Sequence, residues 1–221
     1  MKRVLICLGV LAGVLAAPVP HASASWSSIV CHGNNSNDPQ FKRADARAYA
    51  YVAKGEGYEY AGGCWNDNNI DDTPNQPDSG GEGPDCSGLV FKAWELKNAW
   101  GAPGGQWWDR IQDIHGPYSS TSFHNAGTGG GLPFFQVAKS NALYMDAFAR
   151  DGHVGLLYSS YRNSDGTYNF IQAKGDSYGT NIWGENWMSD SDYRAIRRRG
   201  WTADCYPSCA AATPAEPVIV R

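Results

Sequence analysis

The chain has 221 residues, and its 22 Asp and Glu outnumber its 18 Lys and Arg, which gives a formal net charge of −4 at neutral pH. This length suffices for one domain with a substantial hydrophobic core. Because phosphate contacts need clustered cations, the acidic balance excludes nucleic acid as an expected partner.

The first residues have the order of a secretion signal. Lys2 and Arg3 give a positive start, residues 4–17 form an apolar run, and Ala22-Ser23-Ala24 offers the small residues that a signal peptidase recognises. The apolar run is too short for a lasting transmembrane anchor. We therefore predict a signal peptide at 1–24, secretion of the mature chain, and no stable membrane anchor.

Three further segments follow the predicted signal. Residues 25–40 are polar and indicate an irregular lead-in. Residues 41–202 contain the predicted helices and strands and are expected to form the folded domain. Residues 203–221 contain two cysteines and three prolines and indicate a C-terminal tail.

The first half of the domain predicts helices. Apolar side chains at helical spacing and two closing glycines predict a helix at 41–54. Residues 65–85 form a long loop rich in Asp, Asn, Pro and Gly, and loops of that length are usually functional or disordered. Residues 87–100 present an apolar face and predict a second helix that Gly101 stops. The Gly-rich and aromatic stretch at 102–132 predicts no regular element.

The second half of the domain predicts strands. Four short runs are β-prone and are separated by turns, namely residues 143–149, 153–159, 168–173 and 193–199. Asn163-Ser164-Asp165-Gly166 is a strong hairpin signal. Helices followed by strands predict an α+β fold with helices packed on an antiparallel sheet. The basic run Arg197-Arg198-Arg199 predicts a solvated edge.

The cysteine count indicates a free thiol. Cys7 would leave with the signal, and five cysteines would remain in a secreted, disulfide-permissive setting. The remaining cysteines are Cys31, Cys64, Cys86, Cys205 and Cys209. An odd number leaves at least one thiol unpaired. Cys31 with Cys64 and Cys205 with Cys209 is one pairing, and bridges from both termini to the body of the domain are another.

Cys86 is the candidate nucleophile. It stands in Gly83-Pro84-Asp85-Cys86-Ser87-Gly88, where the loop ends and the second helix begins. Unpaired N–H groups and the helix dipole favour an anion there, so we expect a lowered thiol pKa. The alternative is that Cys86 is a disulfide partner and another cysteine is free.

His153 and Gln172 are the candidate partners of that thiol. His153 begins a strand-like run, where a base is rigidly aimed. Gln172 is a polar residue within the apolar run of the next strand, and its amide oxygen can accept from the imidazole. Each residue alone would more often be structural. Together with Cys86 they predict a Cys-His-polar triad, with the backbone N–H of Cys86 as an oxyanion donor.

Three motifs resemble the NlpC family of papain-like cell-wall cysteine peptidases. Asp85-Cys86-Ser87-Gly88-Leu89-Val90 resembles the family's cysteine motif, and Gly152-His153-Val154-Gly155 resembles its histidine motif. Tyr58-Glu59-Tyr60-Ala61-Gly62 is similar to its upstream Tyr-x-Trp-Gly-Gly motif. The resemblance extends over residues 41–200.

The resemblance implies a papain-like fold and hydrolysis of an amide bond in peptidoglycan stem peptides, between D-γ-glutamyl and a diamino acid. It implies catalytic roles for Cys86, His153 and Gln172, and substrate-binding roles for Tyr58, Asp85 and Ser87. We accordingly expect a secreted monomer, extracellular or associated with the cell wall, whose partner is bacterial peptidoglycan and which needs no cofactor.

The sequence also departs from the family. The third catalytic residue there is most often His, where this chain has Gln172, and Asp146 follows Tyr144-Met145 in place of a Pro-Gly-Asp turn. The long loop and the aromatic stretch are additional. These differences leave two alternatives open: an amidase or acyltransferase on the same fold, and a non-catalytic wall-binding protein.

Metal signals in the sequence are weak. Asp67, Asn69 and Asp71 alternate as at the start of a calcium loop, but the required glycine is missing, so a solvated loop is the default. His115 and His124 have no ligand at zinc spacing. We therefore predict no metal site.

Overall fold

The computed structural model describes residues 42–65, 83–96, 115–129, 131–175 and 177–201. Over these residues the chain forms an α+β fold of helices and antiparallel sheet, as the sequence predicts. The predicted signal peptide, lead-in and C-terminal tail lie outside the described residues, and so does the acidic loop considered for calcium. Cys31, Cys205 and Cys209 lie outside them as well.

Six strands form the main sheet, in the order β3-β8-β4-β5-β6-β7, with every neighbouring pair antiparallel. These strands are β3 (Phe134–Val137), β4 (Ala147–Arg150), β5 (His153–Arg162), β6 (Tyr168–Ala173), β7 (Thr180–Glu185) and β8 (Arg194–Arg198). A separate two-stranded ladder joins β1 (Gly63–Cys64) to β2 (Gly83–Pro84). The helices are α1 (Arg43–Val52), α2 (Cys86–Ala93), α3 (Ser120–His124) and a short 3-10 turn at Lys139–Asn141.

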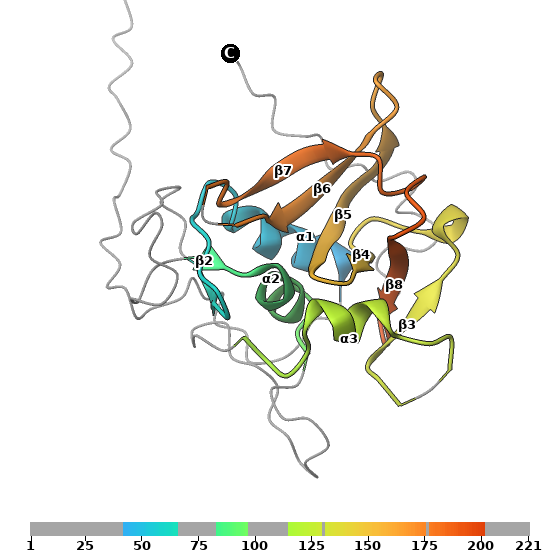
Figure 1. Cartoon of the computed structure of the whole chain (residues 1–221), viewed down its shortest axis with the longest axis horizontal. Coiled ribbons are helices and arrows are strands. Elements are labelled where there is room, and N and C mark those ends of the chain that lie inside the picture. Colours follow the sequence, from blue (N-terminus) through green and yellow to red (C-terminus); the bar gives the residue numbers. More distant parts are fainter. Residues whose placement is uncertain (1–41, 66–82, 97–114, 130, 176, 202–221) are drawn as a thin grey trace, which may run out of the picture.

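Side chains alternate between the two faces of the main sheet. One face, which includes Val154 and Leu156, packs against the helices in the larger core. The opposite face, which includes Leu157 and Phe170, packs against Trp187 in a smaller cluster. Figure 1 shows α2 beside the start of β5 and the β5–β6 hairpin at the far end of these strands. Because side chains alternate along a strand, His153 at the start of β5 belongs to the Trp187 face.

Several strand predictions are confirmed. The predicted strand at 168–173 is β6, and the one at 153–159 lies within β5. The hairpin forms as predicted, because Gly166 adopts a φ of 90° and its N–H donates to the Asn163 carbonyl at 3.0 Å. The sequence analysis missed β3, β7 and α3. Both strands are only partly buried, so few buried side chains mark one face of either strand.

The second helix ends earlier than predicted. It was expected to continue to Trp100, but α2 ends at Ala93. Glu95 adopts a left-handed φ of 51°, and the Leu96 N–H donates to the Phe91 carbonyl at 3.2 Å. This is the bonding of a Schellman turn, which usually has glycine where Glu95 stands. The sequence analysis took Gly101 as the residue that stops the helix, whereas the left-handed residue after the helix is Glu95.

The basic run on β8 is not the solvated edge that its composition predicted. Arg198 is only 4% exposed, and its guanidinium donates to the carbonyl of Trp94 at the end of α2. Burial lowers the pKa of Arg198 to about 10. Arg197 pairs with Asp146, with 2.6 Å between the Arg197 Nη2 and the Asp146 Oδ2. Both cations are thus used inside the fold, where they satisfy a helix terminus and a buried carboxylate.

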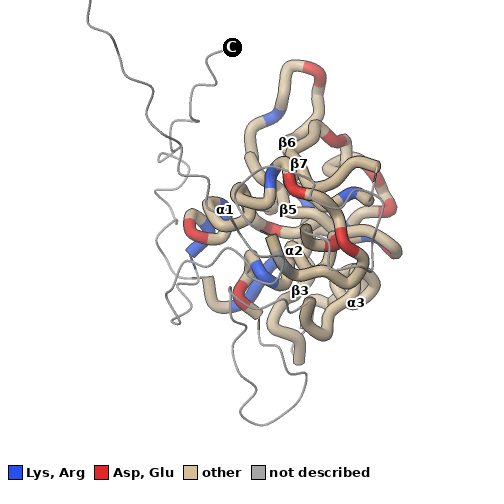
Figure 2. The backbone as a smooth tube through the Cα atoms, turned by 90° about the vertical axis from the view of Figure 1, so that its left-hand side faces the viewer, with Lys and Arg blue, Asp and Glu red and all other residues tan. Residues whose placement is uncertain are grey.

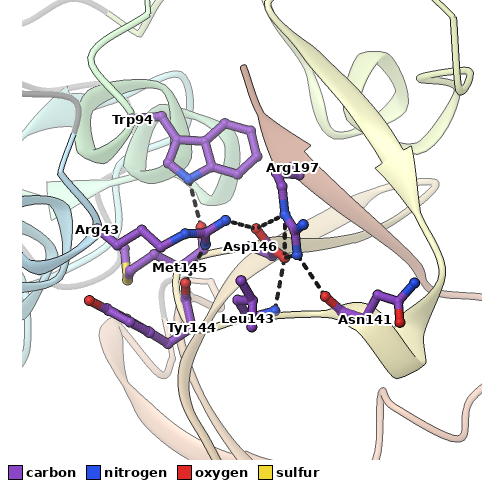
Figure 3. Close-up of polar contacts among 8 residues, drawn as sticks. All are labelled: Arg43, Trp94, Asn141, Leu143, Tyr144, Met145, Asp146 and Arg197. Atoms are coloured by element: carbon purple, nitrogen blue, oxygen red, sulfur yellow. Dashed lines mark hydrogen bonds and ion pairs between the residues drawn. The ribbon is translucent and has the colours of Figure 1, made fainter. Parts of the chain in front are cut away.

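Asp146 is the centre of a buried polar network (Figure 3). Its side chain is fully buried and accepts from Arg43 at 2.8 Å and from Arg197 at 2.6 Å and 3.0 Å. The Leu143 N–H donates to it at 2.9 Å, and Arg43 also donates to the Tyr144 carbonyl at 2.5 Å. The network joins α1, the turn before β4, and β8, which fixes the strand that leads to His153.

Charge on the described elements is mixed. Figure 2 shows acidic and basic residues interspersed along the tube, and acidic residues stand at several turns. Among the described residues, no helix has the length and apolar character that crossing a membrane requires.

Candidate active site

The start of α2 is fixed by Asp85. The Asp85 Oδ1 accepts from the Gly88 N–H at 2.6 Å, as an N-cap carboxylate does. The Asp85 N–H donates to the Gly62 carbonyl at 3.0 Å, and the Ala61 N–H donates to the Asp85 Oδ2 at 3.2 Å. These bonds hold the first turn of α2, and with it Cys86, against the turn that leads into β1.

Gly88 permits the close approach of α2 to that turn. A Cβ added at Gly88 would lie 2.0 Å from the Gly62 carbonyl oxygen, a distance that no real contact allows. Any side chain at this position would push the helix, and therefore the thiol two residues earlier, away from its neighbours. The glycine of the Asp-Cys-Ser-Gly motif thus has a packing reason.

Cys86 is a free, buried thiol, only 8% exposed. Its pKa is not lowered, as its place at the helix start predicted, but raised to about 11, because burial and the charge of Asp85 disfavour the thiolate. Hydrogen bonds from the backbone of Val154 and of Ser87 oppose that rise. The thiol is therefore protonated at neutral pH, and its use as a nucleophile requires a base.

The Cys86 sulfur reaches the start of β5. The backbone of Val154 hydrogen-bonds to it, which favours the thiolate. The nitrogen of Val154 belongs to the peptide unit that joins it to His153. The sulfur therefore lies against the peptide bond of the candidate base.

His153 and Gln172 are in contact. The His153 Nε2 lies 2.6 Å from the Gln172 Oε1. A carbonyl oxygen only accepts, so Nε2 carries the proton and Nδ1 carries the lone pair. The neutral ring is therefore held in the tautomer that can take a proton at Nδ1.

The surroundings of His153 favour its neutral form. Its ring meets Trp187 edge to face, with 5.6 Å between the centroids. Burial lowers the pKa of His153, and the positive charges of Arg150 and Lys174 lower it further, whereas the hydrogen bond that His153 donates to Gln172 raises it. At neutral pH the imidazole is thus unprotonated and available as a base.

Gly155 makes room for this arrangement. The strand register places it opposite Gln172, and a Cβ added there would lie 3.0 Å from the Gln172 Cβ and 2.9 Å from the Trp187 ring. A side chain at this position would displace one of the two groups that orient His153. The glycine of the His-Val-Gly motif is therefore explained by the packing of the imidazole's neighbours.

A residue that the sequence analysis did not select, His115, lies next to the nucleophile motif. The His115 Nε2 is 3.0 Å from the Asp85 Oδ2 and 2.9 Å from the Ser87 Oγ. Its Nδ1 lies 2.9 Å from the Gly116 carbonyl oxygen, which only accepts, so Nδ1 carries a proton. The Nε2 thus lies between the Asp85 carboxylate and the Ser87 hydroxyl. No local pattern in the sequence marks His115, because its contacts come from folding alone.

Ser87, His115 and Asp85 do not form a Ser-His-Asp triad. In such a triad the serine and the carboxylate contact opposite ring nitrogens, whereas here both contact Nε2. The Ser87 hydroxyl also donates to the Asp85 Oδ1 at 3.1 Å. The cluster is a polar network around the helix cap.

The three residues expected to bind substrate occupy different settings. Asp85 and Ser87 are 7% and 4% exposed, and both are engaged with His115. Tyr58 is half-buried in the segment between α1 and β1. That segment is tied to the main sheet, because the Thr180 Oγ1 donates to the Gly57 carbonyl at 3.0 Å.

Over the described parts of the chain, no group of three or more His, Cys, Asp or Glu side chains is arranged to hold a metal ion. The site is therefore described by its thiol, imidazole and amide groups.

Comparison with known proteins identifies no relative. No family model matches the chain, and neither the curated proteins nor the solved structures contain a match. What defines the class of site is the geometry itself: a free buried thiol at a helix start and an oriented imidazole at the start of a strand.

Proposed function

We propose that the chain is a secreted cysteine hydrolase of papain-like fold that cleaves an amide bond in the stem peptides of bacterial peptidoglycan. The bond is of the D-γ-glutamyl–diamino acid type that the sequence motifs imply. The observation that carries the proposal is the placement of the Cys86 sulfur against the His153–Val154 peptide, together with the 2.6 Å contact that orients His153 through Gln172.

The chemistry follows from the protonation states. The Nδ1 of His153 takes the proton of the Cys86 thiol as the sulfur attacks the amide carbonyl carbon. The imidazolium then gives that proton to the departing amine, leaving a thioester on Cys86. Water, deprotonated by the same Nδ1, hydrolyses the thioester and restores the thiol. The backbone N–H of Cys86 at the start of α2 is the candidate oxyanion donor.

The raised pKa of Cys86 favours one other function, a wall-binding protein without catalysis. A thiol with a pKa of about 11 is unreactive at neutral pH unless His153 assists it. Such a protein would bind purified wall without releasing peptide.

Digestion of purified peptidoglycan tests the proposal. The wild-type protein should release fragments with a free D-glutamyl end, and Cys86→Ala should release none while still binding wall. Release of intact full stems would indicate an amidase instead. Equal digestion by wild type and Cys86→Ala would exclude the cysteine mechanism, and binding without any release by wild type would favour the wall-binding function.

A further inference from the structure

We propose that Glu185 is a positioning residue of the active site, which fixes the orientation of the Gln172 amide and thereby the tautomer of His153. This inference deepens the proposed function and rests on it for its catalytic consequence. Its structural part, the tautomer of His153, is measurable without any substrate.

The need for such a residue comes from the amide itself. A carboxylate presents acceptors in either orientation, whereas an amide presents an acceptor from one end and donors from the other. If the Gln172 amide were rotated by half a turn, its NH2 would face the His153 Nε2. The ring would then have to accept at Nε2 and carry its proton on Nδ1, which would remove the base. Gln172 is fully buried, so bulk water cannot set its orientation.

Glu185 selects the productive orientation. The Gln172 Nε2 donates to the Glu185 Oε1 at 2.8 Å, and a carboxylate accepts only. The NH2 end is therefore directed to Glu185, and the oxygen end is left for the His153 Nε2 at 2.6 Å. In the rotated amide, the Gln172 oxygen would face the Glu185 carboxylate oxygen, and two acceptors would repel each other. The Gln172 NH2 would face the His153 Nε2, which could accept from it only if the imidazole proton moved to Nδ1.

Lys174 supports Glu185. The Lys174 Nζ lies 2.9 Å from the same Glu185 Oε1 that accepts from Gln172, with the two side chains 35% and 19% exposed. The Lys174 ammonium makes this a charge-assisted contact, and charge-assisted hydrogen bonds are stronger than neutral ones. The result is a chain of contacts from Lys174 through Glu185 and Gln172 to His153. The other charged group that acts on His153 is Arg150 of β4. The uncharged Trp187 ring packs edge to face against the His153 ring.

The test compares Glu185→Leu with a double variant, Gln172→Glu combined with Glu185→Gln. Glu185→Leu removes the acceptor that orients the amide. The double variant exchanges carboxylate and amide: position 172 then presents only acceptors to His153, and position 185 supplies the NH2 group. Asp192→Asn, which removes an exposed charge from the turn before β8, is the matched control.

Nitrogen-15 NMR of the His153 ring and peptidoglycan hydrolysis are the two readouts. Wild type, Asp192→Asn and the double variant should show the Nε2–H tautomer, and Glu185→Leu should show a mixture. Glu185→Leu should lose roughly 10-fold to 100-fold in kcat/KM, by analogy with groups that orient metal-ligating histidines through their other ring nitrogen. The double variant should recover most of that loss, with the acid limb of its pH profile moved upward by the new carboxylate beside His153.

Two results would overturn the inference. One is an unchanged tautomer in Glu185→Leu. The other is a loss in Glu185→Leu that the double variant does not restore, since that would reflect general damage to β6 and β7. If the tautomers behave as expected but no variant cleaves wall, the inference about Glu185 stands and the proposed function fails.

Discussion

The Asp85 carboxylate, whose charge disfavours the Cys86 thiolate, is paired with His115 at 3.0 Å. Asp85 directly precedes Cys86, whereas His115 is distant from both in the sequence. When both nitrogens of His115 carry a proton, its positive charge offsets that of Asp85 and is expected to limit the effect of Asp85 on the thiol. This contact predicts that His115 influences the reactivity of Cys86 through Asp85.

Removal of His115 should make the thiol less reactive, and removal of the Asp85 charge should make it more reactive. The wild-type pKa of Cys86 is raised to about 11. In His115→Gln the uncompensated carboxylate should move the midpoint of Cys86 alkylation by iodoacetamide to higher pH. Asp85→Asn keeps a capping side chain and should move the midpoint to lower pH. Peptide mapping by mass spectrometry assigns the label to Cys86.

His124→Gln is the control for that experiment. His124 is the last residue of α3, and its Nδ1 contacts the Ala149 carbonyl of β4 at 3.1 Å. Its alkylation midpoint should equal that of wild type. Identical midpoints in His115→Gln and wild type would show that the ion pair has no influence on the thiol.

The pH profile of hydrolysis should report His153 on its acid side. Burial lowers the pKa of His153 below its usual 6.5, so the ring remains an unprotonated base to a lower pH than a free imidazole does. As pH falls, kcat/KM should decline with a midpoint below 6.5, and at alkaline pH it should stay level until the thiol titrates near pH 11. A midpoint at or above 6.5, measured on soluble stem peptide, would contradict the buried setting of the base.

Substitution of Gly155 by alanine adds only one methyl group, but it should reduce both stability and activity. In Gly155→Ala the new methyl would lie 2.9 Å from the Trp187 ring and 3.0 Å from the Gln172 Cβ, so one of them must move. Overpacking of this kind costs about 1 to 3 kcal/mol in the free energy of unfolding. Because Gln172 and Trp187 both contact His153, kcat/KM should fall as well. Urea denaturation and peptide hydrolysis measure the two effects.

Gly127→Ala is the matched control for Gly155→Ala. The nearest atom to its added Cβ is the Gly129 nitrogen at 3.8 Å, an ordinary contact. Stability and activity should both remain close to wild type. An equally mild effect of Gly155→Ala would mean that the strand relaxes around the methyl and that the packing account of the motif is wrong.

The sequence predicted the parts of the fold and site that local patterns determine. The strand at 168–173, the hairpin at Gly166 and the helix start at Cys86 depend on alternation, a turn residue and a cap within a few positions. The same alternation places His153 and Gln172 on one face of neighbouring strands, where their contact is observed.

Features created by tertiary contacts could not be predicted in that way. The capping of α2 by Arg198 depends on a residue more than a hundred positions away, so the glycine signal misplaced the end of the helix. The pKa of Cys86 was predicted to be lowered because the helix dipole is readable in sequence, whereas the burial that outweighs it is not. Glu185 and His115 act on the site only through folded geometry.

Asp146 should be the most destabilising of the polar positions to change. In Asp146→Asn, the buried guanidinium of Arg43 loses its ionic partner and that of Arg197 loses its bidentate acceptor (Figure 3). Breaking a buried ion pair from one side typically costs roughly 3 to 5 kcal/mol, because the remaining charge is left uncompensated. Thermal and urea unfolding of Asp146→Asn should show that loss, while the exposed Asp192→Asn should unfold like wild type.

The double variant Asp146→Leu with Arg43→Met separates an ionic role from a packing role. It removes the carboxylate and one of the two cations that it holds, so it should be less destabilised than the sum of its single changes if charge compensation is what matters. Additive losses would show instead that the network stabilises the fold through its hydrogen bonds to the Leu143 N–H and the Tyr144 carbonyl. In both cases the free energy of unfolding should fall while the alkylation midpoint of Cys86 changes little, because Asp146 holds the turn before β4 rather than the start of α2.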